Sequence, residues 1–535
     1  MVEVKIVSPS KATIKADPDS LKRIRACTFY KNTSAEFQYK RHLKNKYFKM
    51  NYPEKWELHK QTLKLKVDRS LLFEEDGELC IRPGYLEYLK KDFSLNIENL
   101  ISYPKPKPLP WYKKLKYEPR DYQKISTEEL IKEKHANVEL CTGAGKTLIL
   151  LMIAQKLGLK TLVVTPSESI FLEILETFKE HFGPSTIGCL GGGMKKLGKK
   201  IIISISDSVA NLKEGTKEYE EISGFDVLLG DESHTIPAET LEAMCFGVLK
   251  NIPYRFFLSG TQTRGDGTEK LLHSIIGKTV HTLSTAQAVR SGFICDHEYR
   301  VLKVLTTATG FNSPDALEMK RQHFLYNDNI SDFIAKLSQA VYENKKEQTL
   351  VLVDEVDQIV NLVRKLKIPY SVATSTNDTI SILAAIFNKD KARLKKAYKK
   401  NPEEFLKKVN EIMTPEQKAL LELIKNSSPK QAVKDFNEGK ARVLVGTSCI
   451  STGTNIFPTH HTVNWQGGSS EIKTKQGAIG RSVRNLKGSI YEDLHAPKHK
   501  SIIWDFDVVG VDVMKRHLDL RVGFYKDSET PIIFI

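Results

Sequence analysis

The sequence lacks the cysteine patterns of disulfide scaffolds and zinc modules. Its seven cysteines are odd in number and widely scattered along 535 residues, and no two of them form a CxxC pair. This distribution argues against both a disulfide framework and a structural zinc site. We therefore expect reduced and mostly buried thiols, as in a cytoplasmic protein.

Long apolar runs and a secretory leader are also missing. The longest apolar segment, Thr147 to Leu159, is interrupted by Gln155 and Lys156 well before it could cross a bilayer. The first residues, MVEVKIVSPSKATIKAD, alternate apolar and polar side chains, whereas a signal peptide has a charged region followed by an apolar one. We expect neither a membrane span nor a signal peptide.

Basic residues are in excess. Lys and Arg number 81 against 65 Asp and Glu, which gives a formal net charge of +16. Such an excess attracts polyanions over a long range, so nucleic acid is the natural candidate partner. An ordinary charged surface is the alternative that composition leaves open.

The order of strand-like and helix-like segments predicts three domains. Residues 1–102 predict a small α+β domain, in part from a hairpin turn between two apolar runs. Residues 103–116 are rich in Pro and Lys and predict an extended linker. Over residues 117–296, and again over residues 297–535, short apolar strands alternate with helices. This pattern predicts two α/β domains built on parallel sheets.

Two basic segments could face nucleic acid. Residues 31–56 are expected to form a loop in which Lys and Arg alternate with Tyr, Phe and Trp, a mixture that suits phosphate contacts and base stacking. Residues 380–433 are expected to form a basic helical insertion in the last domain. A solvated loop and a solvated helical face are the ordinary alternatives, and the pattern alone does not separate them from the functional ones.

The segment TGAGKT follows a predicted strand and precedes a predicted apolar helix, the context that a phosphate-binding loop requires. Lys146 can reach the β and γ phosphates of a nucleotide, and the hydroxyl of Thr147 can bind Mg²⁺ at the start of the helix. Backbone N–H groups of the loop can surround the phosphate oxygens. These loop residues are Thr142, Gly143, Ala144 and Gly145.

Two further motifs supply acidic and basic groups. FDVLLGDESH predicts a buried strand that ends in Asp231, which can hold Mg²⁺, and Glu232, which can orient and deprotonate an attacking water. KQGAIGRSVRN predicts the start of a helix with Arg481 and Arg484 on one face. Their guanidinium groups can stabilise charge on a transferring phosphoryl group.

In this combination the motifs resemble those of the superfamily 2 DExH helicases and translocases. The resemblance implies two tandem RecA-like domains that share ATP and Mg²⁺ and move along nucleic acid. YEPRDYQ resembles the segment of the family that reads adenine, in which Gln123 contacts the base with support from Arg120 and Tyr122. GTSCISTGTNI resembles the motif in which Gly453 and Asn455 approach the nucleotide.

The resemblance also implies coupling and nucleic-acid contacts. Ser259 and Thr261 of LSGTQTRGDG would couple hydrolysis to strand movement, and His234 would relay between that motif and Gln476. The contacts with nucleic acid would come from the following residues: Pro166, Ser167, Ser208, Thr447 and Ser448.

Three positions depart from the common pattern of the superfamily. Glu139 stands where many members have Ala or Gly, only Ser208 remains of a common T-x-x-S pattern, and Asn455 replaces a frequent Asp. These changes leave the nucleotide chemistry intact.

The motifs TKQGAIGRSVR, SIIWDFD and KRHLDLRVGFY are similar to those of phage helicases that remodel branched DNA during recombination and fork rescue. That resemblance implies an ATP-dependent DNA helicase in the host cytoplasm, with residues 1–102 binding DNA, that works as a monomer. The same motor would also suit an RNA helicase or remodeller, or the duplex-translocating subunit of a restriction system. A non-catalytic nucleic-acid binder is disfavoured because every charged residue of the site is present.

Overall fold

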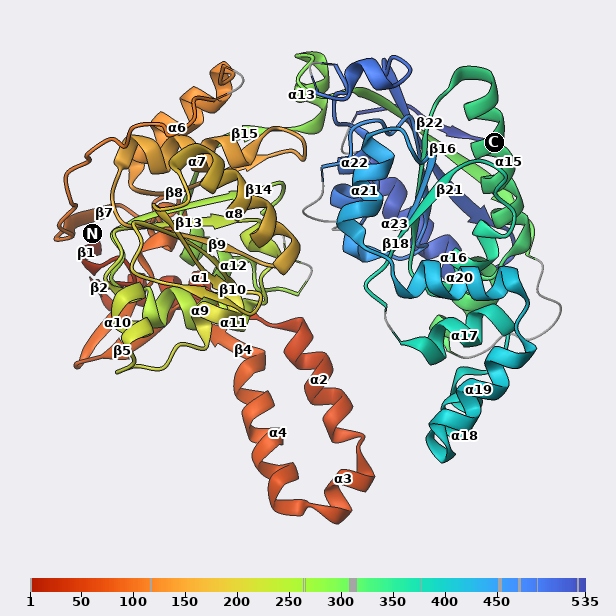
Figure 1. Ribbon diagram of the computed structural model, residues 1–535. Coiled ribbons are helices and arrows are strands. Elements are labelled where there is room, and N and C mark those ends of the chain that lie inside the picture. Colours follow the sequence, from red (N-terminus) through yellow and green to blue (C-terminus); the bar gives the residue numbers. More distant parts are fainter. Residues whose placement is uncertain are drawn as a thin grey trace. The chain divides into compact units, whose positions relative to one another are not determined.

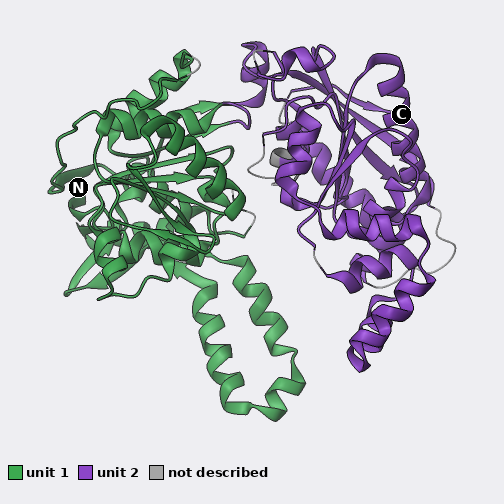
Figure 2. Cartoon of the chain, viewed as in Figure 1, with its two compact units in different colours: residues 1–140, 145–283 green, residues 141–144, 284–535 purple. Residues whose placement is uncertain are grey.

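The computed structural model describes residues 2–115, 118–262, 264, 266–306, 315–376, 378–450, 455–469, 473–487, 489–526 and 529–535, without the side chains of residues 473, 475 and 476. The chain forms two compact units (Figure 2). Unit 1 consists of residues 1–140 and 145–283, and unit 2 of residues 141–144 and 284–535. Within the described ranges, no helix is long and apolar enough to cross a membrane.

A five-stranded sheet of order β5-β6-β2-β1-β7 opens unit 1. Its only parallel pair is β1 with β7, and the turn between β5 and β6 lies at Asp76 and Gly77, as the hairpin pattern predicts. Asp17 caps the helix α1 by accepting a hydrogen bond from the backbone of Ser20. The elements are β1 (Val2–Ser8), β2 (Lys11–Lys15), α1 (Pro18–Thr28), β5 (Leu72–Glu75), β6 (Glu78–Ile81), η1 (Pro83–Tyr85), α5 (Leu86–Leu89) and β7 (Leu95–Asn99).

Three helices inserted between short paired strands project from unit 1 (Figure 1), and we call them the helical arm. The expected loop at residues 31–56 is therefore wrong. Asn32 and Asn45 cap the first two helices, and Pro53 begins the third, where its missing N–H costs nothing. The elements are β3 (Phe29–Lys31), α2 (Thr33–Leu43), α3 (Lys46–Asn51), α4 (Pro53–Val67) and β4 (Asp68–Ser70).

The main sheet of unit 1 has eight strands in the order β11-β10-β12-β9-β13-β14-β8-β15. All neighbours are parallel except β10 and β11. Its strands are β8 (His135–Leu140), β9 (Thr161–Thr165), β10 (Ile187–Gly191), β11 (Met194–Lys196), β12 (Ile201–Ile205), β13 (Val227–Asp231), β14 (Tyr254–Ser259) and β15 (Lys278–Leu283).

Helices alternate with the strands of this sheet. They are α6 (Asp121–Glu133), α7 (Lys146–Leu157), α8 (Glu168–Phe182), α9 (Ser206–Ala210), α10 (Lys217–Ser223), η2 (Ser233–Thr235), α11 (Ala238–Ala243), η3 (Met244–Val248) and α12 (Glu269–Ile276). Because parallel strands end at the same edge of a sheet, the segments that follow β8, β9, β13 and β14 meet there. The loop before Lys146, Pro166 and Ser167, the acidic pair and the segment after Ser259 therefore lie at one edge.

The N-terminal sheet and the main sheet of unit 1 share one hydrophobic core. Buried residues from both contribute to it, among them Val4 and Ile81 from the first and Leu162 and Leu228 from the second. The approach is close at Gly84, where an added Cβ would come within 2.4 Å of the carbonyl oxygen of Ser274. Residues 1–102 and the main sheet are consequently packed as one body.

Unit 2 is built on a seven-stranded sheet of order β18-β19-β17-β20-β21-β16-β22, and every neighbouring pair is parallel. The predicted class, α/β with parallel sheets, is confirmed. The strands are β16 (Asp296–Val304), β17 (Thr349–Val353), β18 (Tyr370–Ala373), β19 (Val443–Gly446), β20 (His461–Trp465), β21 (Lys500–Val508) and β22 (Ile532–Phe534).

The helices of unit 2 include those expected between residues 380 and 433. Of these, α17 and α20 contribute buried residues to the core, whereas α18 and α19 bury none. The helices are α13 (Thr285–Arg290), α14 (Ala316–Lys320), η4 (Arg321–Leu325), α15 (Asp328–Lys345), α16 (Val356–Val363), α17 (Thr379–Phe387), α18 (Lys391–Lys400), α19 (Pro402–Ile412), α20 (Pro415–Lys425), α21 (Pro429–Asn437), η5 (Ser448–Ile450), η6 (Lys473–Ile479), α22 (Gly480–Ser482), η7 (Glu492–Leu494) and α23 (Asp512–Lys526).

A buried charged network joins α23 to this sheet. The guanidinium of Arg521 pairs with both carboxylate oxygens of Asp505 at 2.7 and 2.8 Å, and Tyr525 donates its hydroxyl to the same carboxylate at 2.6 Å. Arg521 also donates to the carbonyl oxygen of Gly468, at 2.8 Å, in the segment that leads to η6. Since removing one partner of a buried ion pair is strongly destabilising, this network fixes the C-terminal helix in place.

Candidate active site

The loop between β8 and α7 has the backbone of a phosphate-binding loop. Gly143 and Gly145 take φ angles of 86° and 73°, a conformation that side chains other than glycine rarely adopt. A Cβ at Gly145 would also come within 2.6 Å of the side-chain nitrogen of Gln123. The helix α7 begins at Lys146, as predicted, and the N-terminus of a helix is suited to bind an anion.

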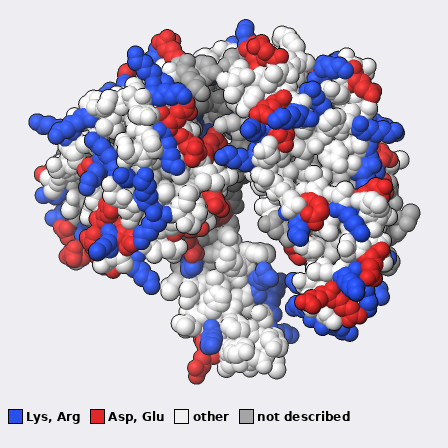
Figure 3. Space-filling view, viewed as in Figure 1, with Lys and Arg blue, Asp and Glu red and all other residues white. Residues whose placement is uncertain are grey.

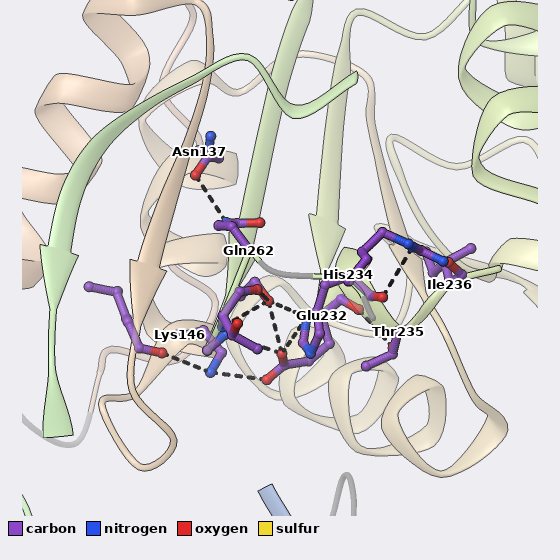
Figure 4. A network of polar contacts seen from close by, with 12 residues as sticks. Asn137, Lys146, Glu232, His234, Thr235, Ile236 and Gln262 are labelled. Atoms are coloured by element: carbon purple, nitrogen blue, oxygen red, sulfur yellow. Dashed lines mark hydrogen bonds and ion pairs between the residues drawn. The ribbon is translucent and has the colours of Figure 1, made fainter. Parts of the chain in front are cut away.

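Lys146 is held next to the acidic end of β13 (Figure 4). Its ammonium lies 3.0 Å from a carboxylate oxygen of Glu232 and donates to the carbonyl oxygen of Leu140 at 3.3 Å. Only 9% of the Lys146 side chain and 14% of the Glu232 side chain are exposed. Two loops that are far apart in the sequence are therefore joined by a buried ion pair.

Asp231 is the buried neighbour of this pair. Burial, and then the charge of Glu232, raise the pKa of its carboxyl group to about 7, although Lys146 opposes the shift. Its Oδ1 atom has no hydrogen-bond partner within the described part of the chain. A divalent cation would satisfy that oxygen and offset the cost of burying the charge, so Asp231 and Thr147 suit Mg²⁺.

Glu232 has the opposite electrostatic character. Burial acts to raise the pKa of its carboxyl group, but the charges of Lys146 and His234 outweigh burial, and the pKa is lowered. The residue therefore stays ionised and can accept a proton. Its backbone has a φ angle of 45°, a left-handed conformation that costs a residue with a side chain about 1–2 kcal/mol. Such strain is commonly stored at functional sites.

The residues expected to couple hydrolysis to movement are joined by hydrogen bonds. The hydroxyl of Ser259 contacts Nδ1 of His234 and donates to the carbonyl oxygen of Thr261 at 2.7 Å. Nδ1 of His234 lies 3.7 Å from a carboxylate oxygen of Glu232. The hydroxyl of Ser259 also donates to a carboxylate oxygen of Glu232 at 3.5 Å, so the end of β14 contacts Glu232 directly.

The segment expected to recognise adenine forms the start of α6. Gln123 is buried, accepts a hydrogen bond from the backbone N–H of Arg120 at 2.9 Å, and donates to the carbonyl oxygen of Gly145 at 3.4 Å. Arg120 donates to the hydroxyl of Tyr122 at 3.3 Å. The structure therefore joins this segment to the phosphate-binding loop.

The other expected site residues lie where strands end. Pro166 and Ser167 follow β9, and Ser208 lies in α9 after β12, all at the same edge of the main sheet of unit 1. In unit 2, Thr447 and Ser448 follow β19. The carbonyl oxygen of Asn455 accepts a hydrogen bond from Asn437 at 2.7 Å, and Gly453 lies outside the described residues.

The expected arginine motif adopts an irregular helix in unit 2. A wide-turn helix, η6, contains Gln476, whose side chain is not described, and it continues into the single turn α22. Arg481 lies in this turn and is buried, whereas Arg484 lies beyond its end at Ser482. The prediction that both arginines share one helical face is wrong, because the helix ends between them.

Lys498 contacts the arginine motif, and the sequence did not predict it as a site residue. Its ammonium donates to the carbonyl oxygens of Ser482 at 2.6 Å, Arg484 at 2.7 Å and Phe457 at 3.2 Å. Burial, with a contribution from the charge of Arg484, lowers its pKa to about 8. A lysine in the segment APKHK carries no motif that would signal this role.

Comparison with known proteins relates part of this chain to DNA translocases and restriction enzymes. A family model described as "Type III restriction enzyme, res subunit" matches residues 116–264, which include the phosphate-binding loop, the acidic pair and Ser259. The DNA 3'-5' translocase XPB2 of Sulfurisphaera tokodaii is 29% identical over 271 residues, or 49% of this chain. The chain is therefore similar to DNA translocases and helicases, as its motifs predict.

Two further similarities cover more of the chain. The ATP-dependent DNA helicase uvsW of Enterobacteria phage T4 is 22% identical over 438 residues, which are 79% of this chain and 74% of the phage protein. A fragment of an HsdR subunit of a type I restriction enzyme from Vibrio vulnificus matches 78% of this chain, and 68% of its own, with a TM-score of 0.50 and 17% identity. The match to the archaeal translocase spans 58% of that protein.

The raised pKa of Asp231 makes stability depend on pH. Because this pKa of about 7 lies above the ordinary 3.8, ionisation of Asp231 costs stability as the pH rises from about 4 to about 7. Asp231→Asn should raise the unfolding midpoint of the protein at pH 8 without nucleotide or metal, and the gain should shrink as the pH falls toward 4. Asp519→Asn, at a largely exposed position, is the control. A gain that is independent of pH would contradict the assignment.

The contacts of Lys498 predict that it positions the arginine motif. Lys498→Met keeps the length of the side chain but removes all donors to the three carbonyl groups. We expect the kcat for ATP hydrolysis to fall about tenfold or more, equivalent to about 1.4 kcal/mol. Lys487→Met, at an exposed position nearby, should leave kcat unchanged. A wild-type kcat in Lys498→Met would show that these contacts are unimportant for turnover.

Proposed function

We propose that the protein hydrolyses ATP to move along DNA and to unwind or branch-migrate forks and junctions, in the cytoplasm of a host cell. The observation that carries the proposal is the buried ion pair of Lys146 and Glu232 beside Asp231, at the strand ends where a phosphate-binding loop also lies. This arrangement supports the proposal, because Lys146 could bind phosphate, Glu232 could act as the base for water and Asp231 could bind a metal ion.

Each group has a defined task in the proposed reaction. Bound Mg²⁺ would neutralise charge on the phosphates, and Asp231 and Thr147 are the residues that would hold it. When a nucleotide enters, Lys146 can exchange part of its interaction with Glu232 for the β and γ phosphates. Glu232, being ionised, then orients the attacking water and accepts its proton.

The arginines of unit 2 have a proposed task in the same reaction. Arg481 and Arg484 would supply positive charge to the γ-phosphoryl group as the transition state forms. Binding and release of the nucleotide would then alternate the hold that the two units have on the phosphate backbone. Because these contacts fall mainly on phosphates, binding should be sensitive to salt and largely independent of sequence.

We propose branched DNA as the substrate because of the helical arm and the similarity to the phage helicase uvsW. The helical arm carries an excess of basic residues over acidic ones and several large exposed side chains, among them Phe37 at 68% and Tyr47 at 75% exposure. Figure 3 shows Lys and Arg on the arm beside uncharged surface. Basic and aromatic groups together suit backbone contacts and stacking on unpaired bases.

A second candidate is the duplex-translocating subunit of a restriction system. The description of the matching family model and the similarity to an HsdR fragment favour it. Such a subunit would follow intact duplex, so duplex DNA should stimulate its ATPase activity at least as well as a fork or a four-way junction. ATPase rates with single-stranded, duplex, forked and four-way DNA, and with matched RNA, distinguish these functions.

Loss of Lys146 tests the proposed site most simply. Lys146→Ala should abolish ATP hydrolysis and unwinding, because it removes the ammonium that pairs with Glu232 and that is expected to bind the β and γ phosphates. Its affinity for DNA should stay within about threefold of wild type, since the Lys146 side chain is buried and is expected to contact the nucleotide. Lys156→Ala, at the far end of the same helix, is the matched control. Retained turnover in Lys146→Ala would refute the site.

The proposed role of the arm can be tested without disturbing the shared core. Lys31 and Asp68 are directly paired between β3 and β4, so a two-residue Asn-Gly turn can replace residues 32–67. We expect the affinity for forks and four-way junctions to fall about tenfold or more, while unstimulated ATP hydrolysis and the unfolding midpoint remain. Wild-type junction affinity in this variant would contradict DNA binding by the arm.

A further inference from the structure

Both roots of the helical arm are bonded to segments that leave the active site. At the root of α2, the backbone N–H of Thr33 donates to the carbonyl oxygen of Asp266 at 2.9 Å, in the turn that follows β14. At the root of α4, Lys66 pairs with Glu239 at 2.9 Å, and Arg69 pairs with Glu242 at 2.8 Å. Both acidic residues belong to α11, the first α-helix after Glu232.

Arg264 links the first of these roots to the acidic motif. Its guanidinium donates to the carbonyl oxygens of His234 at 3.1 Å and Ile236 at 2.8 Å, in the segment labelled in Figure 4. The same guanidinium pairs with the carboxylate of Asp266 at 3.2 Å. Asp266 also accepts hydrogen bonds from the backbone and hydroxyl of Thr268. The backbone after Glu232 and the turn under α2 are thus held by one buried side chain.

The turn and the root of the arm are in direct contact. Gly267 takes a φ angle of 74°, and a Cβ on it would come within 2.3 Å of the carbonyl oxygen of Lys31 in β3. Next along the chain, Lys270 donates to the carbonyl oxygens of Cys27 at 2.7 Å and Phe29 at 2.8 Å. Contacts this tight do not leave room for the turn to shift without shifting β3.

We propose that Arg264 and Asp266 are positioning residues that couple the helical arm to the ATP site. A movement of Glu232 and His234 shifts the backbone whose carbonyl groups Arg264 binds. Arg264 then shifts Asp266, whose carbonyl oxygen accepts the hydrogen bond of Thr33, the first residue of α2. The inference rests on the proposed function, because the arm must bind DNA for the coupling to have an effect. Since coupling between two sites is reciprocal, DNA on the arm should change hydrolysis, and nucleotide should change the affinity of the arm for DNA.

Gly267→Ala tests the coupling, because the added methyl group must displace the turn from Lys31. Gly198→Ala is the matched control, since Gly198 has a nearly equal φ angle of 71° but nothing within 4 Å of an added Cβ. The first measurement is the ratio of ATPase rates with and without a saturating four-way junction. The second is the change in junction affinity caused by a non-hydrolysable ATP analogue.

We expect Gly267→Ala to lower the stimulation ratio about fivefold or more and to remove the effect of nucleotide on junction affinity. Gly198→Ala should keep both. Arg264→Lys, which keeps the charge but cannot bridge two carbonyl groups and Asp266 together, should reproduce the loss and serves if Gly267→Ala does not fold. Wild-type values in either Gly267→Ala or Arg264→Lys, or an equal loss in Gly198→Ala, would overturn the coupling. A wild-type protein without junction stimulation would instead overturn the proposed function, and the inference with it.

Discussion

The chemistry of unit 1 depends on one buried ammonium group placed beside two buried carboxylates. Lys146 starts the helix that follows the loop after β8, whereas Asp231 ends β13 and Glu232 follows it. Burying either the ammonium or the carboxylates without the opposite charge would be strongly destabilising. The two carboxyl groups consequently have very different pKa values. Glu232 is kept ionised by Lys146 and His234, while burial holds the pKa of Asp231 at about 7. Lys146 thereby keeps Glu232 available as a base, and Asp231 is suited to bind a cation.

The N-terminal residues are part of the same mechanical body as this site. Their sheet shares its core with the main sheet of unit 1, and the helical arm rises from strands that contact the turn after β14 and the helix α11. Because the arm is attached in this way, a movement of the residues at the site can move the arm without a separate hinge. The proposed link through Arg264 follows from this attachment, and it would let the arm and the site act on each other over a few contacts.

The parts of this structure that the sequence predicts are those with local patterns. The parallel sheets follow from short apolar strands, and the phosphate-binding loop follows from two glycines and a lysine before an apolar helix. Residues 31–56, which form the first part of the arm, were expected to be a loop because basic and aromatic residues are mixed there. In α4 the apolar residues also show no helical period that would have indicated a helix. Long-range contacts were equally invisible, since Lys498 and Arg264 bind backbone carbonyl groups that any residue provides. The early end of α22, which separates Arg481 from Arg484, has no signal in the spacing of these arginines.

Proton release on nucleotide binding tests the central claim most directly. Calorimetric titration with Mg²⁺ and a non-hydrolysable ATP analogue, in two buffers of different ionisation enthalpy, reports how many protons leave the protein. At pH 7 the carboxyl group of Asp231 should be about half protonated, so a cation bound to it should release about half a proton. The account predicts this release in the wild-type protein and its loss in Asp231→Asn. Equal release by the two proteins, or none by either, would contradict it.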